Sequence, residues 1–247
     1  MTANAAARAP SPPQHAAATP VAPVKLTART PLEQLLHALN QPLTGLQCSM
    51  EVALASPRTV EQYVRGLREG LELTDRMRAL VGAIREVTDM EEKTNAARNY
   101  EEWSTADLGT MLRTIIDDLA PVAEVKSIRV EFECDSAGTC VSGAAKHRAL
   151  ETAVFRLLES ALGSAALGSA LCVELGGDAE NTKIADWLRA RWQAGWPPSV
   201  AWRTEIGLLV SQAGFEQLDA AWERQCSGEM ESVTIRLRST PGKVNRS

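Results

Sequence analysis

The sequence predicts an α+β protein in which a long antiparallel helical hairpin precedes an α/β sandwich. Two observations support this fold class. Apolar residues recur at heptad spacing over about residues 31–92, which is typical of long amphipathic helices. Beyond residue 103, helical stretches are interspersed with short segments of alternating apolar and polar residues, which indicates helices packed on one face of a mixed sheet. We expect three regions: a tail over residues 1–29, the hairpin over 30–95 and the sandwich over 103–240.

Length and charge narrow the function classes. The 247 residues suit one or two domains. The balance of 26 Lys and Arg against 31 Asp and Glu gives a net charge of −5, so the chain lacks the basic excess of a general nucleic-acid binder. It contains no run of about 18 apolar residues, and we expect no membrane span.

The cysteines predict neither a disulfide framework nor a metal site. Five are present, an odd number, and no two have Cys-x-x-Cys spacing. This usage fits the reducing cytosol, so we expect a cytoplasmic protein without a structural metal. The Cys positions are 48, 134, 140, 172 and 226.

The first 29 residues are rich in Ala and Pro, and the first acidic residue of the chain is Glu33. Such a composition buries too little apolar surface to offset the entropy of ordering, which predicts a disordered tail. The alternative is a transit peptide, since the segment carries Arg and no acid.

The first predicted helix has a clear start. Thr30 can serve as the N-cap, Pro31 suits the first helical position, and Glu33 stands where a capping-box carboxylate belongs. Apolar residues then recur in steps of four and three, which is a heptad seam. They are Leu32, Leu36, Leu39, Leu43, Leu46, Met50 and Ala53.

A second helix is predicted after Ser56-Pro57, which supplies a break and a second cap, and we expect it to reach about Glu92. Two helices alone leave half of each apolar seam in water, so we expect two copies of the hairpin to form a four-helix bundle in a homodimer. Its apolar residues are Val60, Val64, Leu67, Leu71, Met77, Leu80, Val81, Ile84 and Val87.

The sandwich is predicted from shorter segments. Helices are expected over 107–119, 146–163 and 206–212, and strands over 128–134 and 171–175. A final hairpin would run from 217–224 through a Ser227-Gly228 turn to 233–237, while 180–203 stays ambiguous.

Of the three histidines, His37 is the candidate nucleophile. His15 is in the tail and His147 opens a predicted helix, whereas His37 flanks the seam of the first helix. A neutral imidazole is a good nucleophile near pH 7. Asn40 and Gln41 follow three and four positions later on the same helical face. Pro42 frees a backbone carbonyl close to His37 and bends the helix.

The stretch from His37 to Leu43, His-Ala-Leu-Asn-Gln-Pro-Leu, resembles the phosphoacceptor box of sensor histidine kinases. The resemblance covers the hairpin and implies that it dimerises into a four-helix bundle. It also implies that His37 carries phosphate, which a receiver-domain Asp of a response regulator accepts. Asn40 matches the position that orients a hydrolytic water in that family.

One departure from the family lies next to the histidine. The family usually has an acidic residue there, which accepts the ring proton, and this chain has Ala38. Glu33 is four residues before His37 and can reach the ring, although the capping box competes for it. The hypothesis is that autophosphorylation from ATP is weakened.

The sandwich resembles the ATP-binding domain of the same family, with departures where nucleotide would bind. Ser160 stands where the family has an Asn that ligates Mg²⁺, and Arg156 replaces the preceding Asn of that box. Asp186 matches the adenine-binding Asp without the accompanying glycines. Gly207 is the one glycine kept in the last phosphate-binding turn, and Glu205 beside it would repel a triphosphate.

Four tryptophans lie between these boxes, at 187, 192, 196 and 202. We interpret them as core residues. The alternative is that they fill the space that a nucleotide and its lid would occupy.

The chain as a whole is most similar in character to the kinase-like histidine phosphotransferases. This resemblance implies a dimeric phosphorelay phosphotransferase or pseudokinase that passes phosphate through His37, with Mg²⁺ supplied by the receiver and no productive binding of Mg-ATP. Two alternatives stay open. One is an active soluble sensor histidine kinase with an atypical ATP site. The other is a dimeric protein without phosphotransfer, either an adaptor or a regulator phosphatase that depends on Asn40.

Overall fold

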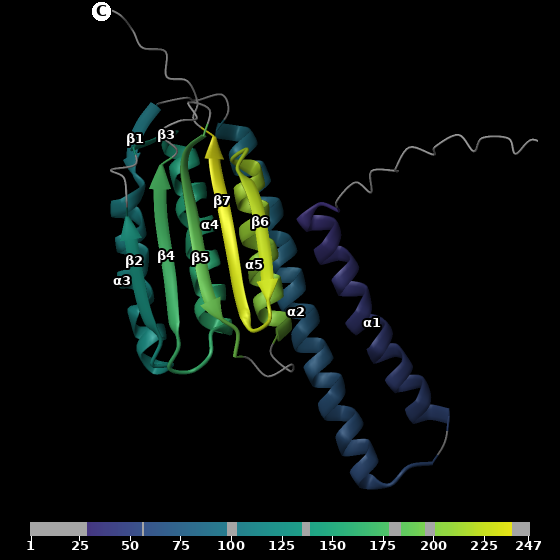
Figure 1. The fold of residues 1–247 in the computed structure, drawn as a ribbon. Coiled ribbons are helices and arrows are strands. Elements are labelled where there is room, and N and C mark those ends of the chain that lie inside the picture. The colour runs from purple at the N-terminus through teal and green to yellow at the C-terminus, as the bar shows by residue number, and fades with distance from the viewer. Residues whose placement is uncertain are drawn as a thin grey trace, which may run out of the picture.

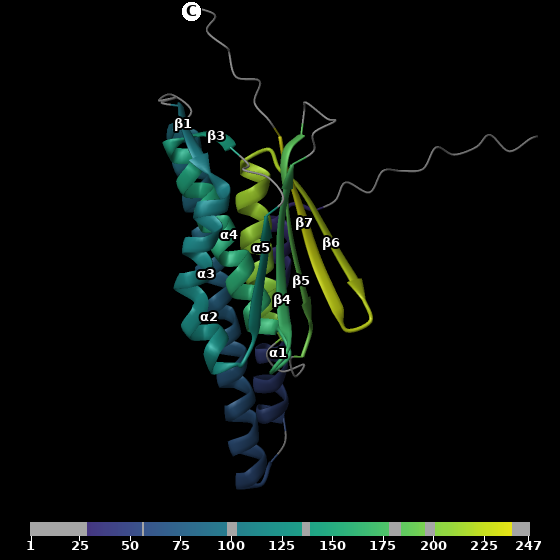
Figure 2. The ribbon, with the colours of Figure 1, turned by 60° about the vertical axis from the view of Figure 1, so that its left-hand side comes forward.

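The structure, a computed structural model, describes residues 29–55, 57–97, 103–134, 139–177, 184–195 and 201–238. Within these ranges the predicted fold class is confirmed: a helical hairpin is followed by helices on one face of a mixed sheet (Figures 1 and 2). The predicted disordered tail lies outside the described residues, apart from Arg29.

The hairpin consists of α1 (Pro31–Ala55) and α2 (Val60–Ala97). The N-cap of α1 is as predicted, because Thr30 N donates to Glu33 Oε2 over 3.0 Å and Glu33 N donates to Thr30 Oγ1 over 3.2 Å. The cap of α2 is Thr59, which exchanges the same pair of bonds with Gln62. The prediction of a cap at Ser56-Pro57 is therefore wrong, because the hydroxyl that satisfies the first turn lies further along the chain. Helix α2 also extends beyond the expected end at Glu92.

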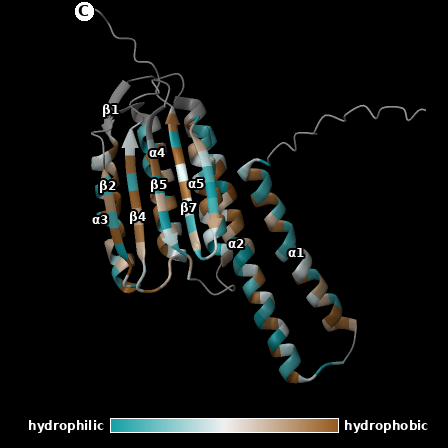
Figure 3. Ribbon diagram, in the orientation of Figure 1, coloured by the Kyte–Doolittle hydropathy of each residue, from teal (hydrophilic) through white to brown (hydrophobic). Residues whose placement is uncertain are grey.

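The heptad seam of α1 divides into two rows. Leu32 and Leu39 pack inside the molecule, and Leu46 approaches Gly70 of α2. Leu36, Leu43 and Met50 are exposed instead. Figure 3 shows that hydrophobic residues continue along the part of the hairpin that extends past the sheet. One apolar row of the hairpin is thus left without a partner in the single chain.

The sandwich has three helices and a five-stranded sheet in its described part. The helices are α3 (Leu108–Val125), α4 (Ala144–Ser164) and α5 (Ala201–Gln217). The sheet order is β2-β4-β5-β7-β6, with β2 parallel to β4 and the other pairs antiparallel. Its strands are β2 (Arg129–Cys134), β4 (Ala170–Gly177), β5 (Ile184–Gln193), β6 (Ala221–Ser227) and β7 (Met230–Arg238).

Three features of the sandwich differ from the prediction. β5 occupies part of the ambiguous segment, and a two-stranded sheet of β1 (Trp103–Asp107) and β3 (Thr139–Gly143) was not predicted as strands. α5 begins before residue 206 and continues to Gln217, so the last hairpin starts later, at Ala221.

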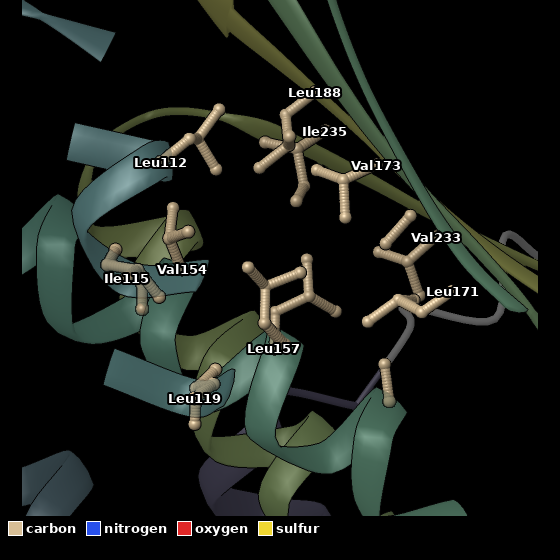
Figure 4. Close-up of a cluster of buried hydrophobic side chains, with 14 of the residues drawn as sticks. Leu112, Ile115, Leu119, Val154, Leu157, Leu171, Val173, Leu188, Val233 and Ile235 are labelled. Carbon is tan, nitrogen blue, oxygen red and sulfur yellow. The ribbon is translucent and has the colours of Figure 1, made fainter. Parts of the chain in front are cut away.

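The main core lies between the helices and the sheet. Side chains of α3 and α4, including Leu112 and Leu157, face those of β4, β5 and β7, including Val173 and Ile235 (Figure 4). Along each strand, side chains that enter this core alternate with side chains on the opposite face of the sheet, as a two-layer sandwich requires. α4 and α5 therefore have one side against the sheet and another toward the hairpin.

Candidate functional site

The first candidate site is the face of α1 that carries His37. His37, Asn40 and Gln41 are all exposed. Thr44, one turn further, donates its hydroxyl to the Asn40 carbonyl oxygen over 2.9 Å. Three of the site residues predicted from sequence therefore lie together on one solvent-facing surface, and Pro42 lies beside them within the helix.

The direction of this face follows from its neighbour Leu35. Leu35 is fully buried in a cluster with Val210 and Ala213 of α5. A residue two positions further along an α-helix lies about 200° around the axis. His37 is therefore on the side of α1 that faces away from α5 and the sandwich.

Pro42 interrupts the hydrogen bonding of α1 close to His37. The proline is buried inside the helix, which continues to Ala55. It has no N–H to donate to the carbonyl of Ala38, four residues earlier. The residue that follows His37 thus has a carbonyl released from the helical ladder, as the sequence indicated.

The predicted competition for Glu33 is visible in the structure. Its Oε2 accepts the hydrogen bond from Thr30 N, which closes the capping box. The carboxylate that could have replaced the missing acid at Ala38 is thus engaged at the start of the helix.

The second candidate site is a cleft of about 470 Å³ among α2, α4 and α5. Arg156, Ser160 and Gly207, all singled out from sequence, lie on its α4 and α5 walls. Its third wall is α2, from Ala79 to Glu86. The cleft that corresponds to the nucleotide site in the resemblance therefore faces the hairpin of the same chain.

Arg156 is bound to two carboxylates in this cleft. Its Nε and Nη2 donate to the two oxygens of Glu86 on α2, over 2.8 and 3.0 Å, and its Nη1 donates to Glu159 over 2.7 Å. Hydrogen bonding to Glu86 raises the pKa of the Arg156 guanidinium above its ordinary value. The wall thus presents two acidic groups around one cation, which disfavours a triphosphate.

Ser160 and Gly207 are in direct contact across the α4–α5 interface. A Cβ added to Gly207 would lie 2.1 Å from Ser160 Oγ, and one added to Gly214 would lie 2.9 Å from Ala153 Cβ. Ser211 Oγ also donates to the Ala153 carbonyl over 2.9 Å. The two helices are joined closely along this line, so no ligand atom fits between Ser160 and Gly207.

Glu205 has a different role from the one expected. Its carboxylate accepts two hydrogen bonds from Arg224 of β6, over 2.7 and 2.8 Å, and Arg224 also binds the buried Glu231 over 3.1 Å. Hydrogen bonding to Glu205 raises the pKa of Arg224. The acid is therefore paired between α5 and the sheet, and it acts as a structural link instead of an isolated negative charge.

Asp186 belongs to β5, where its backbone is in register with Gly177 and Leu237. The structure describes its backbone alone, so the predicted adenine contact stays a prediction.

The tryptophans are distributed over different parts of the sandwich. Trp192 is fully buried in the main core, as interpreted. Trp187 lies against Gly176 on the other face of the sheet, because strand side chains alternate. Trp202 lines a neighbouring cleft of about 440 Å³ beside α2, and Trp196 is outside the described residues. Trp187 and Trp192 therefore do not fill a nucleotide space, and that alternative is wrong for both.

The described ranges contain no cluster of three or more His, Cys, Asp or Glu side chains arranged to hold a metal ion. None of the helices they include is long and apolar enough to cross a membrane.

Comparison with solved structures identifies the fold. The chain is similar to the Acinetobacter baumannii histidine kinase AdeS, with a TM-score of 0.51 and 16% identity over 83% of this chain and 98% of that one. It is also similar to full-length ShkA in complex with AMPPNP, with a TM-score of 0.50 and 14% identity over 86% of this chain and 47% of that one. No family model and no curated protein matches the sequence.

The fold is that of a histidine kinase. Within this fold, α1 and α2 form the expected helical hairpin, and α3 to β7 belong to the expected sandwich. Sequence reasoning missed Glu86 as a cleft residue. The heptad pattern gives it no special place, and only the contact with Arg156 identifies it.

Proposed function

We propose that this chain is a phosphorelay histidine phosphotransferase of a two-component system, which passes phosphate through His37 to or from a receiver-domain Asp of a response regulator. The observation that carries the proposal is the contrast between an exposed His37 surface and a nucleotide-type cleft in which Arg156 is bound to Glu86 and Glu159.

The chemistry needs a free imidazole and access for a second protein. A lone pair of a His37 ring nitrogen attacks the phosphorus of a phosphoaspartate. The new N–P bond forms as the P–O bond to the aspartyl carboxylate breaks, and that carboxylate takes the electron pair. The other ring nitrogen keeps its proton. The reverse step returns the phosphoryl group to a second receiver. Asn40 and Gln41 lie beside the ring and can orient the phosphoryl oxygens by their side-chain amides.

Transfer from a phosphoaspartate depends less than attack on ATP on an acidic residue beside the histidine, and this chain has Ala38 at that position. A phosphoaspartate is already an activated donor, so the reaction depends mainly on positioning the two side chains. The Mg²⁺ of the reaction belongs to the receiver in this proposal. The arrangement of Arg156 and Ser160 supports the same conclusion, because a hydroxyl stands where the expected metal ligand is an amide and Arg156 is already bound to two carboxylates.

The exposed apolar row of the hairpin supports a homodimer. Helix α1 contributes Leu36, Leu43 and Met50, and α2 contributes Leu67 and Leu71, all exposed in the single chain. An apolar groove of about 340 Å³ lies between the same helices. Burial of these residues against a second hairpin would complete a four-helix bundle and place two His37 surfaces on its outside.

The proposal is tested by incubating the protein with a panel of labelled phosphorylated receiver domains. The wild type is expected to acquire acid-labile label and pass it to a second receiver, and His37→Ala is expected to acquire none. The variant Asn40→Ala distinguishes the phosphatase alternative from phosphotransfer. If wild type and His37→Ala both discharge a receiver to inorganic phosphate and Asn40→Ala does not, the chain is a regulator phosphatase and the phosphotransferase proposal is overturned. If no receiver in the panel changes, including the genuine partner, the adaptor alternative stands in its place.

A further inference from the structure

A second, smaller core joins the hairpin to the sandwich. Its buried members come from three different helices: Leu35 of α1, Leu80, Ala83 and Val87 of α2, and Val210 and Ala213 of α5. Leu35 is 0% exposed and Leu80 is 1% exposed in the single chain. These side chains have no partner in the main core, so the contact between hairpin and sandwich is an apolar interface in its own right.

A polar clamp lies beside this interface. The Arg156 guanidinium of α4 presents two parallel N–H groups to the Glu86 carboxylate of α2. This fork geometry fixes the relative orientation of two planar groups, which a single bond does not. Arg156 and Glu86 are 37% and 29% exposed, and both line the cleft between α2 and α4.

The position of α2 against the cleft also keeps the cleft away from His37. A sandwich that delivered a group from this cleft to His37 would have to leave α2, because His37 lies on the opposite side of α1 from α5. The apolar cluster and the clamp both oppose that movement.

We propose that α2 is a permanent intramolecular partner of the cleft, so that hairpin and sandwich form one rigid body in solution with the Arg156–Glu86 pair as its clamp. The sandwich then braces the phosphoacceptor hairpin and performs no delivery motion. This inference concerns the contact alone and stands or falls independently of phosphotransfer.

The test is amide hydrogen exchange on the full chain, comparing Glu86→Ala with the matched control Glu159→Ala. Both variants remove one carboxylate partner of Arg156 and place Ala in a helix, but only Glu86 joins two helices. In the wild type, slow exchange is expected over residues 80–87 and 206–213. Glu86→Ala is expected to raise the exchange rates of both segments together by about tenfold, while Glu159→Ala leaves them unchanged.

Two results would overturn the proposal. One is fast exchange of these two segments already in the wild type, which would mean that the hairpin and sandwich separate freely. The other is an equal effect of the two variants, which would mean that the cross-helix bond has no special role. Exchange in the main-core strands β4 and β7 is measured in the same samples, and unchanged protection there shows that each variant is folded.

Discussion

The two candidate sites of this chain differ in what their polar side chains do. On α1, His37, Asn40 and Gln41 point to solvent and take no visible part in holding the fold together. In the cleft, Arg156 is bound to Glu86 and Glu159. The first region has exposed polar side chains, whereas the second holds Arg156 in ion pairs with residues of its own chain. The difference teaches that one fold can leave the polar residues of one candidate site exposed while those of another become part of the structure.

The largest expected effect is on the first region. His37→Ala should abolish transfer of phosphate from a phosphorylated receiver, because the proposal places the phosphoryl group on the His37 imidazole. The control is His147→Gln, a half-buried histidine at the start of α4, which should transfer normally. Retention of label by His37→Ala would place the phosphoacceptor elsewhere.

A second comparison uses two leucines of α2. Leu80 is 1% exposed in the interface with the sandwich, and Leu67 is 70% exposed on the free row. Leu80→Ala should lower the free energy of unfolding by about 2–5 kcal/mol, independent of protein concentration. Leu67→Ala should leave the dilute chain within about 0.5 kcal/mol of wild type and weaken association at high concentration.

The free energy of unfolding of both variants is measured by denaturant titration at several protein concentrations. Association is measured by sedimentation. Equal, concentration-independent losses for the two variants would contradict the division of α2 into an intramolecular and an intermolecular half.

A third prediction concerns the closed contact between α4 and α5. Gly207→Ala should destabilise the chain by about 1–3 kcal/mol, because its new Cβ meets Ser160 Oγ. Ser160→Ala in the same chain should recover most of that loss by removing the hydroxyl. Gly82 of α2 has nothing within 4 Å of an added Cβ, so Gly82→Ala should be neutral or more stable by about 0.5–1 kcal/mol. Thermal unfolding of the three variants and the wild type tests these expectations, and a neutral Gly207→Ala would mean that the two helices separate easily.

The smallest effect is expected at the cap of α1. Thr30→Ala should cost about 1 kcal/mol, since it removes the acceptor for Glu33 N. Glu33→Gln should cost less, because the amide oxygen can still accept from Thr30 N. Helical content by circular dichroism during thermal unfolding measures both. A larger loss for Glu33→Gln than for Thr30→Ala would show that the negative charge, and not the capping bond, matters there.

Local patterns were enough to predict the hairpin. The capping box of Thr30 and Glu33 and the heptad steps from Leu32 to Ala53 depend only on neighbours along the chain, and α1 follows them. The cap of α2 was placed too early because both Ser56 and Thr59 are good caps, and the choice depends on how the turn closes.

The sandwich was harder to predict from the sequence, because its structure depends on contacts between residues that are far apart in the chain. β5 carries large residues on both faces, with Trp187 outward and Trp192 inward, so its alternation is hidden in the sequence. The contact of Ser160 with Gly207 and the pairing of Glu205 with Arg224 join different elements. No periodicity reveals such neighbours, which is why the sequence suggested a repelling charge at Glu205 where the fold has an ion pair.

The most direct measurement compares two phosphate donors for the same residue. The wild-type chain is incubated with labelled ATP and Mg²⁺, and in parallel with a labelled phosphorylated receiver, and the phosphohistidine at position 37 is quantified by peptide mass spectrometry. Phosphate on His37 from the receiver and none from ATP is the predicted result. Phosphate on His37 from ATP would show that the cleft still binds and delivers a nucleotide, and it would contradict the proposed phosphotransferase in favour of an active kinase.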